Sequence, residues 1–424
     1  MTGVSSFDSG GRLGRRASFV LLVCANVLLM ATASAPSPIY PLYRERWGFS
    51  VTLLTVVFAV YVAGLLGALL TVGSLSDHLG RRPVLVAALL VAAASTAIFW
   101  AADGVGALMI ARVVQGLATG TATAALAAGL VEFAPEGRPH LGATLAAVGT
   151  GVGMAVGAGV VGLLVQVTRQ PDAYVFPLLT LAFVSLAVLV LAIPEPHARR
   201  AGGLASLRPR VRVPREARPE FLASVPALVA GWSMAGLFLA LTPSLVSTVL
   251  HVTFGAAGGL SIALLFLANS VGGVWAVRHP PRAVTSLGAV CLALGCAGLA
   301  VALVLTSVIA FAIGSIVAGL GAGLAFNGTL RAISAATGAA ARAEVFSAAY
   351  VVSYTALSIP ALAAGLLARW WGLELTAYLY LAFVAALSVT AAVHARRSKD
   401  RRRADDEGPG SFPARSRHRV RTPC

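Results

Sequence analysis

A polar turn near residue 80 separates two long apolar runs and carries the side chains of this chain that are best suited to ionic chemistry. From Gly73 onward it reads Gly-Ser-Leu-Ser-Asp-His-Leu-Gly-Arg-Arg-Pro. Gly73 and Gly80 permit close backbone approach. The carboxylate of Asp77 can accept hydrogen bonds from N–H groups at a helix start, where the helix dipole favours an anion. Arg81 and Arg82 can pair with carboxylates or with lipid phosphates.

A second polar group lies inside an apolar run. The sequence Arg-Val-Val-Gln-Gly-Leu-Ala-Thr places Arg112, Gln115 and Thr119 on one face of a helix, with Gly116 beside them. A charge within a membrane-spanning helix is costly and usually faces a cavity or a partner. Three interpretations stay open here: a functional role, snorkelling of the arginine to the outer interface, and pairing with backbone carbonyls.

Glycines recur every four residues in the next apolar run, at Gly149, Gly153 and Gly157. Small residues let membrane helices approach one another closely. The spacing therefore predicts a packing face for a neighbouring helix.

Other polar and aromatic side chains are scattered through the apolar runs and are candidates for lining a substrate pathway. They are Asn26, Ser34, Tyr61, Thr119, Trp232, Asn269, Asn327, Tyr350 and Tyr354. Tyr and Trp in membrane proteins also collect at the lipid–water interface, so an interfacial role is the alternative.

Titratable side chains are scarce in these runs. No Asp, Glu, Lys or His lies clearly in the middle of one, and no P-loop, Gly-x-Ser-x-Gly or His/Cys metal spacing is present. The four cysteines give no disulfide framework. We therefore expect no enzyme activity, no metal and no cofactor.

Composition places the chain in a membrane. Hydrophobic residues make up 58% and charged residues 11% of 424 positions, with a mean hydropathy of +0.85, whereas soluble domains carry about 25% charged residues. A helical span needs about 20 apolar residues, and lipid forces each span to satisfy its own backbone. The apolar runs are approximately 17–42, 51–73, 84–102, 106–132, 141–167, 174–193, 221–245, 256–277, 283–305, 308–330, 345–368 and 375–394.

The distribution of basic residues predicts the orientation. The net charge is +16, and of the 32 Lys and Arg residues all but five fall in the two tails and in alternate connections. The exceptions are Arg44, Arg46, Arg112, Arg169 and Arg369. Under the positive-inside rule both termini are cytoplasmic and the number of spans is even. This pattern also argues against a nucleic-acid partner.

The longest break divides the runs six and six. We expect a cytoplasmic N-tail (1–16), an N-terminal six-helix bundle (17–193), a cytoplasmic central loop (194–220), a C-terminal six-helix bundle (221–394) and a basic, disordered cytoplasmic tail (395–424). The tail could adhere to anionic lipids or act only as a solvated topology anchor.

The turn from Gly73 and the Arg112–Gln115–Gly116 set resemble two motifs of the major facilitator superfamily, over about residues 15–395. The resemblance implies an all-α membrane protein with twelve transmembrane helices in two six-helix bundles, a bacterial-type monomer in the inner membrane. It also implies that Gly73, Asp77, Gly80, Arg81, Arg82 and Glu132 form a conformational latch, with Asp77 near the start of the eleventh helix. Arg112, Gln115 and Gly116 would serve proton coupling. Met154 stands where antiporters of the superfamily carry a proline.

The function expected from these features is alternating-access transport. The leading hypothesis is proton-coupled efflux of small organic molecules, drug-like or metabolite. The alternative is uptake or facilitated diffusion of a sugar, organic acid or other nutrient. A third, remote hypothesis is a membrane sensor that binds without transporting.

Overall fold

The computed structural model describes residues 13–72, 75–138, 140–195, 211–338 and 341–406 of the chain. Gly73 and much of both tails and of the central loop lie outside them. The helices are α1 (Arg15–Ser34), a 3-10 turn η1 (Ser37–Ile39), α2 (Tyr40–Trp47), α3 (Val51–Thr71), α4 (Ser76–Leu79), α5 (Arg81–Trp100), α6 (Val105–Glu132), α7 (His140–Val167), α8 (Asp172–Val190), α10 (Arg218–Ala240), α11 (Thr242–Thr248), α12 (Ala257–Ala276), α13 (Pro281–Val304), α14 (Val308–Ala335) and α15 (Arg342–Asp406).

The described part of the chain has 11 apolar helical segments long enough to cross a membrane. The last of them, Glu344–Arg396, has 53 residues. It leaves helical geometry at Gly372, where φ is 77° and ψ is 164°. Since about 20 residues cross a bilayer, this segment makes two spans and the total is twelve, as predicted.

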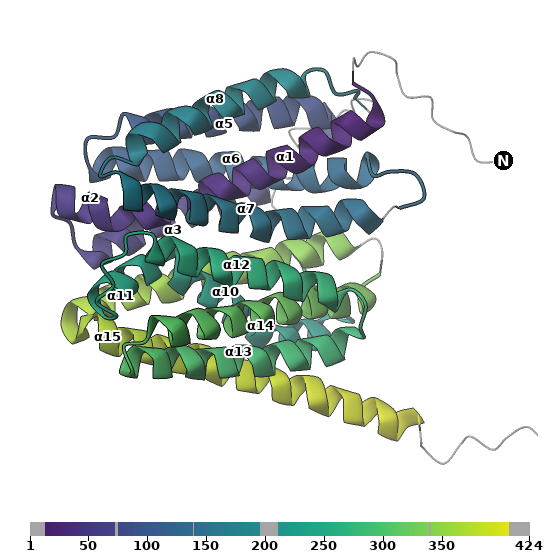
Figure 1. The fold of residues 1–424 in the computed structure, drawn as a ribbon. Helices are drawn as coiled ribbons and strands as arrows, with labels where there is room; N and C mark the ends of the chain where they lie inside the picture. The colour runs from purple at the N-terminus through teal and green to yellow at the C-terminus, as the bar shows by residue number, and fades with distance from the viewer. Residues whose placement is uncertain (1–12, 73–74, 139, 196–210, 339–340, 407–424) are drawn as a thin grey trace, which may run out of the picture.

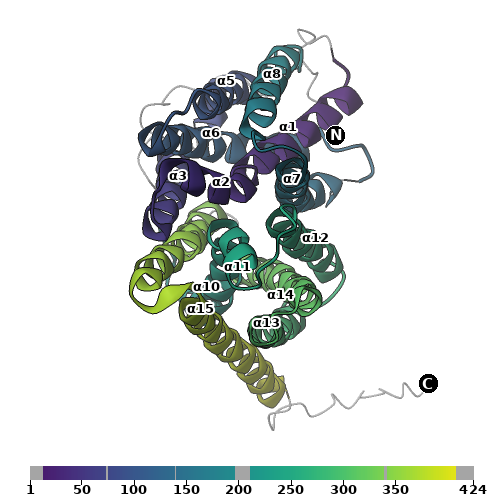
Figure 2. The same cartoon turned by 60° about the vertical axis from the view of Figure 1, so that its left-hand side comes forward.

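These spans form two bundles that lie side by side (Figure 1). In the first, α1 packs on α7, α3 and α5 pack on α6, and α5 packs on α8. In the second, α13 and α12 pack on α14, and α10 and α13 pack on α15. The bundles meet through two helix pairs, α7 with α12 and α3 with α15, and Figure 2 shows this seam from another side. The predicted fold class is confirmed.

The two ends of the molecule are distinct. The start of α1 and the end of α15 lie at one end, which we call the terminal face; α2 and α11 lie at the other, which we call the opposite face (Figure 1). Three hydrogen bonds join the bundles near the opposite face: Arg44 Nη1 to Ser244 Oγ (3.5 Å), Thr52 Oγ1 to Gly365 O (2.7 Å) and Gly255 N to Gln166 Oε1 (2.6 Å).

The first and seventh spans are broken at equivalent places. α1 ends at Ser34, and Pro36 and Pro38 follow in and around a 3-10 turn before α2 begins. α10 ends at Ala240, and Pro243 stands at the start of α11. Proline lacks an N–H and clashes with the preceding turn, so it ends a helix or begins a new one. The first apolar run, 17–42, is thus divided between α1, the 3-10 turn and α2, and the seventh, 221–245, is divided between α10 and α11.

The glycines at four-residue spacing do form a packing face, against α1. A Cβ at Gly149 would lie 2.6 Å from Asn26 Nδ2, and one at Gly153 would lie 2.5 Å from Val27 O. A Cβ at Gly157 would overlap the carbonyl oxygen of Ala31. Backbone atoms cannot move aside cheaply, so α1 and α7 reach this separation only without these side chains.

We predict that Gly153→Val destabilises the first bundle by about 1–3 kcal/mol, the range measured for overpacked cores. The control is Gly67→Val, because a Cβ at Gly67 meets no atom within 4 Å. Thermal unfolding of the purified proteins in detergent measures the difference. Equal midpoints for the two variants would contradict the close packing of α1 on α7.

Candidate functional site

The turn after α3 is organised around the start of α5. Gly80 has a φ of +100°, and a Cβ there would lie 2.7 Å from Glu195 Oε2. Both oxygens of the Glu195 carboxylate accept backbone N–H groups, from Arg81 to Oε1 and from Arg82 to Oε2, each at 2.9 Å. An anion on the first N–H groups of a helix satisfies unpaired donors and complements the helix dipole. Glycine is needed here for its positive φ and for this approach.

Arg82 makes the reciprocal contact. Its Nη1 lies 3.4 Å from Leu191 O and 3.5 Å from Ile193 O, just beyond the last turn of α8. A cation at a helix C-terminus is favoured as an anion is at an N-terminus. The start of α5 and the end of α8 are therefore joined by two contacts of opposite charge.

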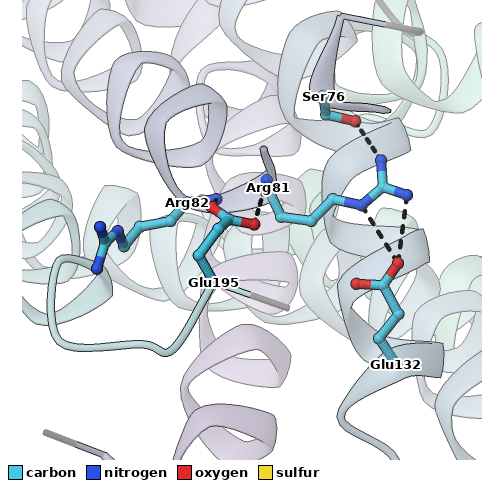
Figure 3. A network of polar contacts seen from close by, with 5 residues as sticks. All are labelled: Ser76, Arg81, Arg82, Glu132 and Glu195. Atoms are coloured by element: carbon cyan, nitrogen blue, oxygen red, sulfur yellow. Dashed lines mark hydrogen bonds and ion pairs between the residues drawn. The ribbon is translucent and has the colours of Figure 1, made fainter. Parts of the chain in front are cut away.

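The guanidinium of Arg81 joins α4, α5 and α6 (Figure 3). Its Nη1 donates to Ser76 Oγ at 2.6 Å, and its Nη2 lies 3.2 Å from Glu132 Oε1, with Nε at 3.4 Å. The side chains of the pair are 13% and 23% exposed, so solvent weakens it less than a surface ion pair. The resemblance implied that both residues belong to one conformational latch, and the structure brings them together. The backbone of Asp77 lies in α4, while its side chain is outside the described part of the structure.

Arg15 binds the C-terminal end of α6. Its Nε and Nη2 donate to Ala134 O at 3.1 and 2.8 Å, and Nη2 reaches Glu132 O at 3.2 Å. Glu132 is the last residue of α6 and Ala134 lies just beyond it, where carbonyls lack an intrahelical partner. The main chain of Glu132 is thus fixed by α1, while its carboxylate faces α5.

In the second bundle, other charged residues bind the corresponding helix ends. Arg282, at the start of α13, pairs with Glu220 at 2.7 Å. Arg331, near the end of α14, donates from Nη1 to Ala276 O at 2.6 Å and to His279 O at 2.9 Å. In the first bundle, Glu132 at the end of α6 presents a carboxylate to Arg81 of the turn. In the second bundle, Arg331 near the end of α14 presents a guanidinium to backbone carbonyls.

Arg112 is fully buried in α6, at 0% exposure. Nη1 donates to Gln115 Oε1 at 2.7 Å and to Ala33 O at 3.2 Å; Nε donates to Tyr40 Oη at 2.6 Å, and Nη2 also donates to that hydroxyl. Gln115 Nε2 in turn donates to Thr32 O at 2.8 Å. These acceptors are all neutral.

Three aromatic rings surround the same guanidinium. Its central carbon lies 5.3 Å from the ring centres of Tyr40 and Tyr61 and 5.7 Å from that of Phe99. Aromatic faces attract cations, most strongly where water is excluded. We call these rings, with Gln115 and the carbonyls of Thr32 and Ala33, the Arg112 cage. The cage supports the interpretation of carbonyl pairing over snorkelling.

Gly116 has a packing reason as well. A Cβ there would overlap Tyr61 O and lie 2.8 Å from Leu65 N. α3 therefore rests directly on α6 beside the cage, and its Tyr61 ring reaches the arginine. In the Arg-x-x-Gln-Gly pattern, Arg112 thus supplies the charge, Gln115 supplies one of its acceptors, and Gly116 leaves room for α3.

The candidate pathway residues fall into two groups. Asn26, Ser34, Tyr61 and Thr119 are buried. Asn26 donates to Ala146 O and Ser34 to Met154 O across the α1–α7 contact, and Thr119 donates to Gln115 O in its own helix. Half-buried side chains make up the second group: Trp232, Asn269, Asn327, Tyr350 and Tyr354.

Acidic side chains stay at the ends of the spans. In the described spans the carboxylates lie in first or last helical turns, as with Glu45, Asp172, Glu220 and Glu374. Within the same residues no group of three or more His, Cys, Asp or Glu could hold a metal ion. Arg112 is therefore a buried cation whose contacts, among the described residues, include no carboxylate.

Sequence reasoning missed Glu195, Glu220 and Arg331. Glu195 lies between two prolines directly after the sixth apolar run, which could have marked it as a fixed carboxylate near the first turn. Arg331 lies at the end of an apolar run, as Glu132 does, and that equivalence was the available signal.

We predict that Glu195→Ala lowers stability by about 1–2 kcal/mol, because it removes a charged cap from two N–H groups. Glu195→Gln should lose less, since an amide oxygen still accepts one bond. Glu136→Ala is the control, because that side chain is 89% exposed and lies 3.7 Å from Arg15. Apparent melting temperatures in detergent give the comparison; a Glu195→Ala midpoint equal to that of the control would contradict the cap.

The comparisons with known proteins agree with this fold. A crystal structure of a bacterial homologue of the human lysosomal transporter Spinster, inward-facing and unoccupied, is similar with a TM-score of 0.76 at 13% identity; the match covers 91% of this chain and 98% of that one. At that identity it shows the fold alone. The multidrug resistance protein MdtL of Shewanella sp. (strain ANA-3) is 34% identical over 105 residues, a match that spans only 26% of MdtL and 24% of this chain.

The family itself follows from a longer match. Residues 22–271 match the family model of the Major Facilitator Superfamily, and they include the turn at α5, the Arg112 cage and the α1–α7 contact. This is more than half of the chain. The chain is a multi-pass membrane protein that belongs to the major facilitator superfamily of transporters.

Proposed function

We propose that this transporter exports small organic molecules in exchange for protons. The observation that carries the proposal is Arg112, a cation buried inside the first bundle whose contacts, among the described residues, include no carboxylate. A protein sustains so costly a group where it has a task. The similarity of a quarter of the chain to a protein named for multidrug resistance supports export as the direction.

Transport would proceed by alternating access. The described apolar core that spans both bundles includes Phe58 and Tyr61 of the first and Phe238 and Leu357 of the second. A further cluster around Leu126 belongs to the first bundle alone, and one around Phe221 to the second alone. We infer that the bundles rock about the shared core, and that the three hydrogen bonds near the opposite face break when that face opens.

The ionic contacts at the terminal face would act as the latch. Arg81 joins the turn to Glu132 of α6, and the Glu195 cap holds Gly80 and the start of α5 in place. By resemblance, Gly73, Asp77 and Arg82 complete the device. Since the start of α1 and the end of α15 lie on this face (Figure 1), and the sequence places its basic residues in the tails and in alternate connections, we infer that this face is cytoplasmic.

Coupling would involve Arg112, Gln115 and Gly116. The cage leaves the guanidinium with neutral partners, so it could influence a proton or solute through its charge without a competing ion pair. Two members of the proposed latch, Glu132 and Asp77, carry titratable carboxyl groups. We propose that protons are exchanged there, at the terminal face.

Facilitated diffusion is the second candidate, and one observation favours it. The acidic groups of the described spans lie at helix ends, so the interior offers no obvious proton carrier. Uptake of a nutrient such as a sugar or organic acid would use the same bundles. In either case we expect a monomer.

Proteoliposomes with an imposed pH gradient separate the two candidates. For one-to-one exchange, a lumen one pH unit more acidic should drive about tenfold solute accumulation, because one pH unit is worth about 1.36 kcal/mol. The solute is chosen by a thermal-shift screen of the purified protein against a chemical library. Nigericin, which collapses the gradient, is the control. Accumulation that stays near unity with and without the gradient would remove proton exchange and leave facilitated diffusion.

The role of the cage is tested by Arg112→Lys. Lysine keeps the charge but cannot reach Tyr40, Ala33 and Gln115 with one planar group. We expect transport to fall at least about tenfold while the protein still inserts, a loss of about 1.4 kcal/mol. Arg46→Lys is the matched control, since Arg46 pairs with Asp172 at 2.8 Å and its side chain is 40% exposed. Wild-type flux in Arg112→Lys would show that planar geometry is dispensable.

A further inference from the structure

Four aromatic side chains of the second bundle form one cluster. Trp232 of α10 is its centre: its ring meets Phe326 of α14 edge to face at 5.5 Å and Tyr354 of α15 edge to face at 4.8 Å. Tyr350 stacks on Tyr354 one turn away, at 6.2 Å. We call these four residues the aromatic wall.

The polar atoms of the wall form no hydrogen bonds to the residues that the structure describes. They are the indole N–H of Trp232 and the hydroxyls of Tyr350 and Tyr354. None of them is among the fully buried polar atoms that lack a partner, so each keeps some accessible area. The side chains are only half-buried. In a protein surrounded by lipid, polar groups must find partners inside the molecule or in water, so the accessible area of these atoms argues for contact with water or a solute rather than with hydrocarbon.

The wall faces the seam between the bundles. Trp232 and Tyr354 pack against the core that both bundles share, beside Tyr61. Ile359, on the other side of α15, is 58% exposed and marks the lipid side of that helix. Asn269 of α12 is also half-buried and without a hydrogen-bond partner in the described residues. An apolar wall with a few free polar groups is the usual character of a small-molecule site.

The charge near the wall is positive. Tyr61 belongs to the shared core against which the wall packs, and its ring centre lies 5.3 Å from the Arg112 guanidinium. The acidic residues of the described spans lie at helix ends, so among them no carboxylate offsets this cation. Aromatic faces alone would attract an organic cation, but a fixed positive charge in a low-dielectric interior opposes it.

We propose that the aromatic wall is a binding site for planar aromatic molecules that are uncharged or carry a single negative charge, and that it discriminates against organic cations. The flat rings of Trp232 and Tyr354 supply the stacking surface. The indole N–H, the two hydroxyls and the Asn269 amide bind one polar substituent of the ligand. This inference rests on the proposed function and names the class of molecule that the transporter would bind.

Equilibrium dialysis of the purified full chain against three naphthalene probes tests the site. The probes share one ring system: 2-naphthol is neutral, 2-naphthoate is an anion, and 2-naphthylmethyl-trimethylammonium is a fixed cation. We expect the first two to bind at least about tenfold more tightly than the third. Trp232→Ala should weaken both by about tenfold, as expected for loss of a stacking ring and its buried area.

Two further variants make the result specific. Trp100→Ala is the matched control, because Trp100 is 59% exposed at the end of α5, and its affinities should equal those of wild type. Tyr350→Phe with Tyr354→Phe keeps both rings and should weaken 2-naphthol and 2-naphthoate about threefold to tenfold through the lost hydroxyls. This double variant also serves if Trp232→Ala fails to fold.

Cation binding as tight as that of 2-naphthoate would overturn the proposal. So would equal affinities of Trp232→Ala and Trp100→Ala, or of the double variant and wild type. Dialysis measures binding without flux, so the two proposals fail separately. Transport that continues without probe binding removes only the aromatic site, and binding without gradient-driven accumulation removes only proton exchange.

Discussion

Lipid offers no hydrogen-bond partners, and that constraint governs the polar groups of this protein. Arg112 shows it most clearly, because a guanidinium that cannot reach water takes its acceptors from Tyr40, Gln115 and the carbonyl of Ala33. The carbonyls are free to accept because α1 ends nearby, before the prolines that break the first span. The broken helix, the close approach of α3 at Gly116 and the buried charge therefore form one arrangement.

The terminal face follows the same rule with helix ends. Glu195, just beyond α8, accepts from N–H groups at the start of α5, and Arg82, at the start of α5, donates to carbonyls just beyond α8. Arg15 donates to carbonyls at the end of α6, and Arg331 donates to carbonyls at the end of α12. Each contact satisfies groups that a helix leaves unpaired. Both bundles therefore satisfy their helix ends with charged side chains, but with different residues. At the end of α6 the side chain is the anionic Glu132, and near the end of α14 it is the cationic Arg331.

Much of this was accessible from sequence. Hydropathy and basic residues predicted the spans, and residue spacing predicted the α7 packing face at Gly153 and the shared face of Arg112 and Gln115. Residue spacing did not identify the partners of Gly80 and Arg112, because Glu195 lies far along the chain from Gly80 and Tyr40 lies far from Arg112. Periodicity describes one helix at a time, whereas these contacts depend on how separate helices are placed. The break at Leu241 was missed because Pro243 lies inside an uninterrupted apolar run.

The Glu195 contact also has a mechanical consequence. Glu195 lies just beyond the end of α8, and its carboxylate accepts from the first two N–H groups of α5. A displacement of α8 therefore acts directly on the turn at Gly80, and a displacement of α5 acts on the chain that leaves α8. Neither helix can tilt alone at this end of the first bundle, so the two behave there as one rigid unit.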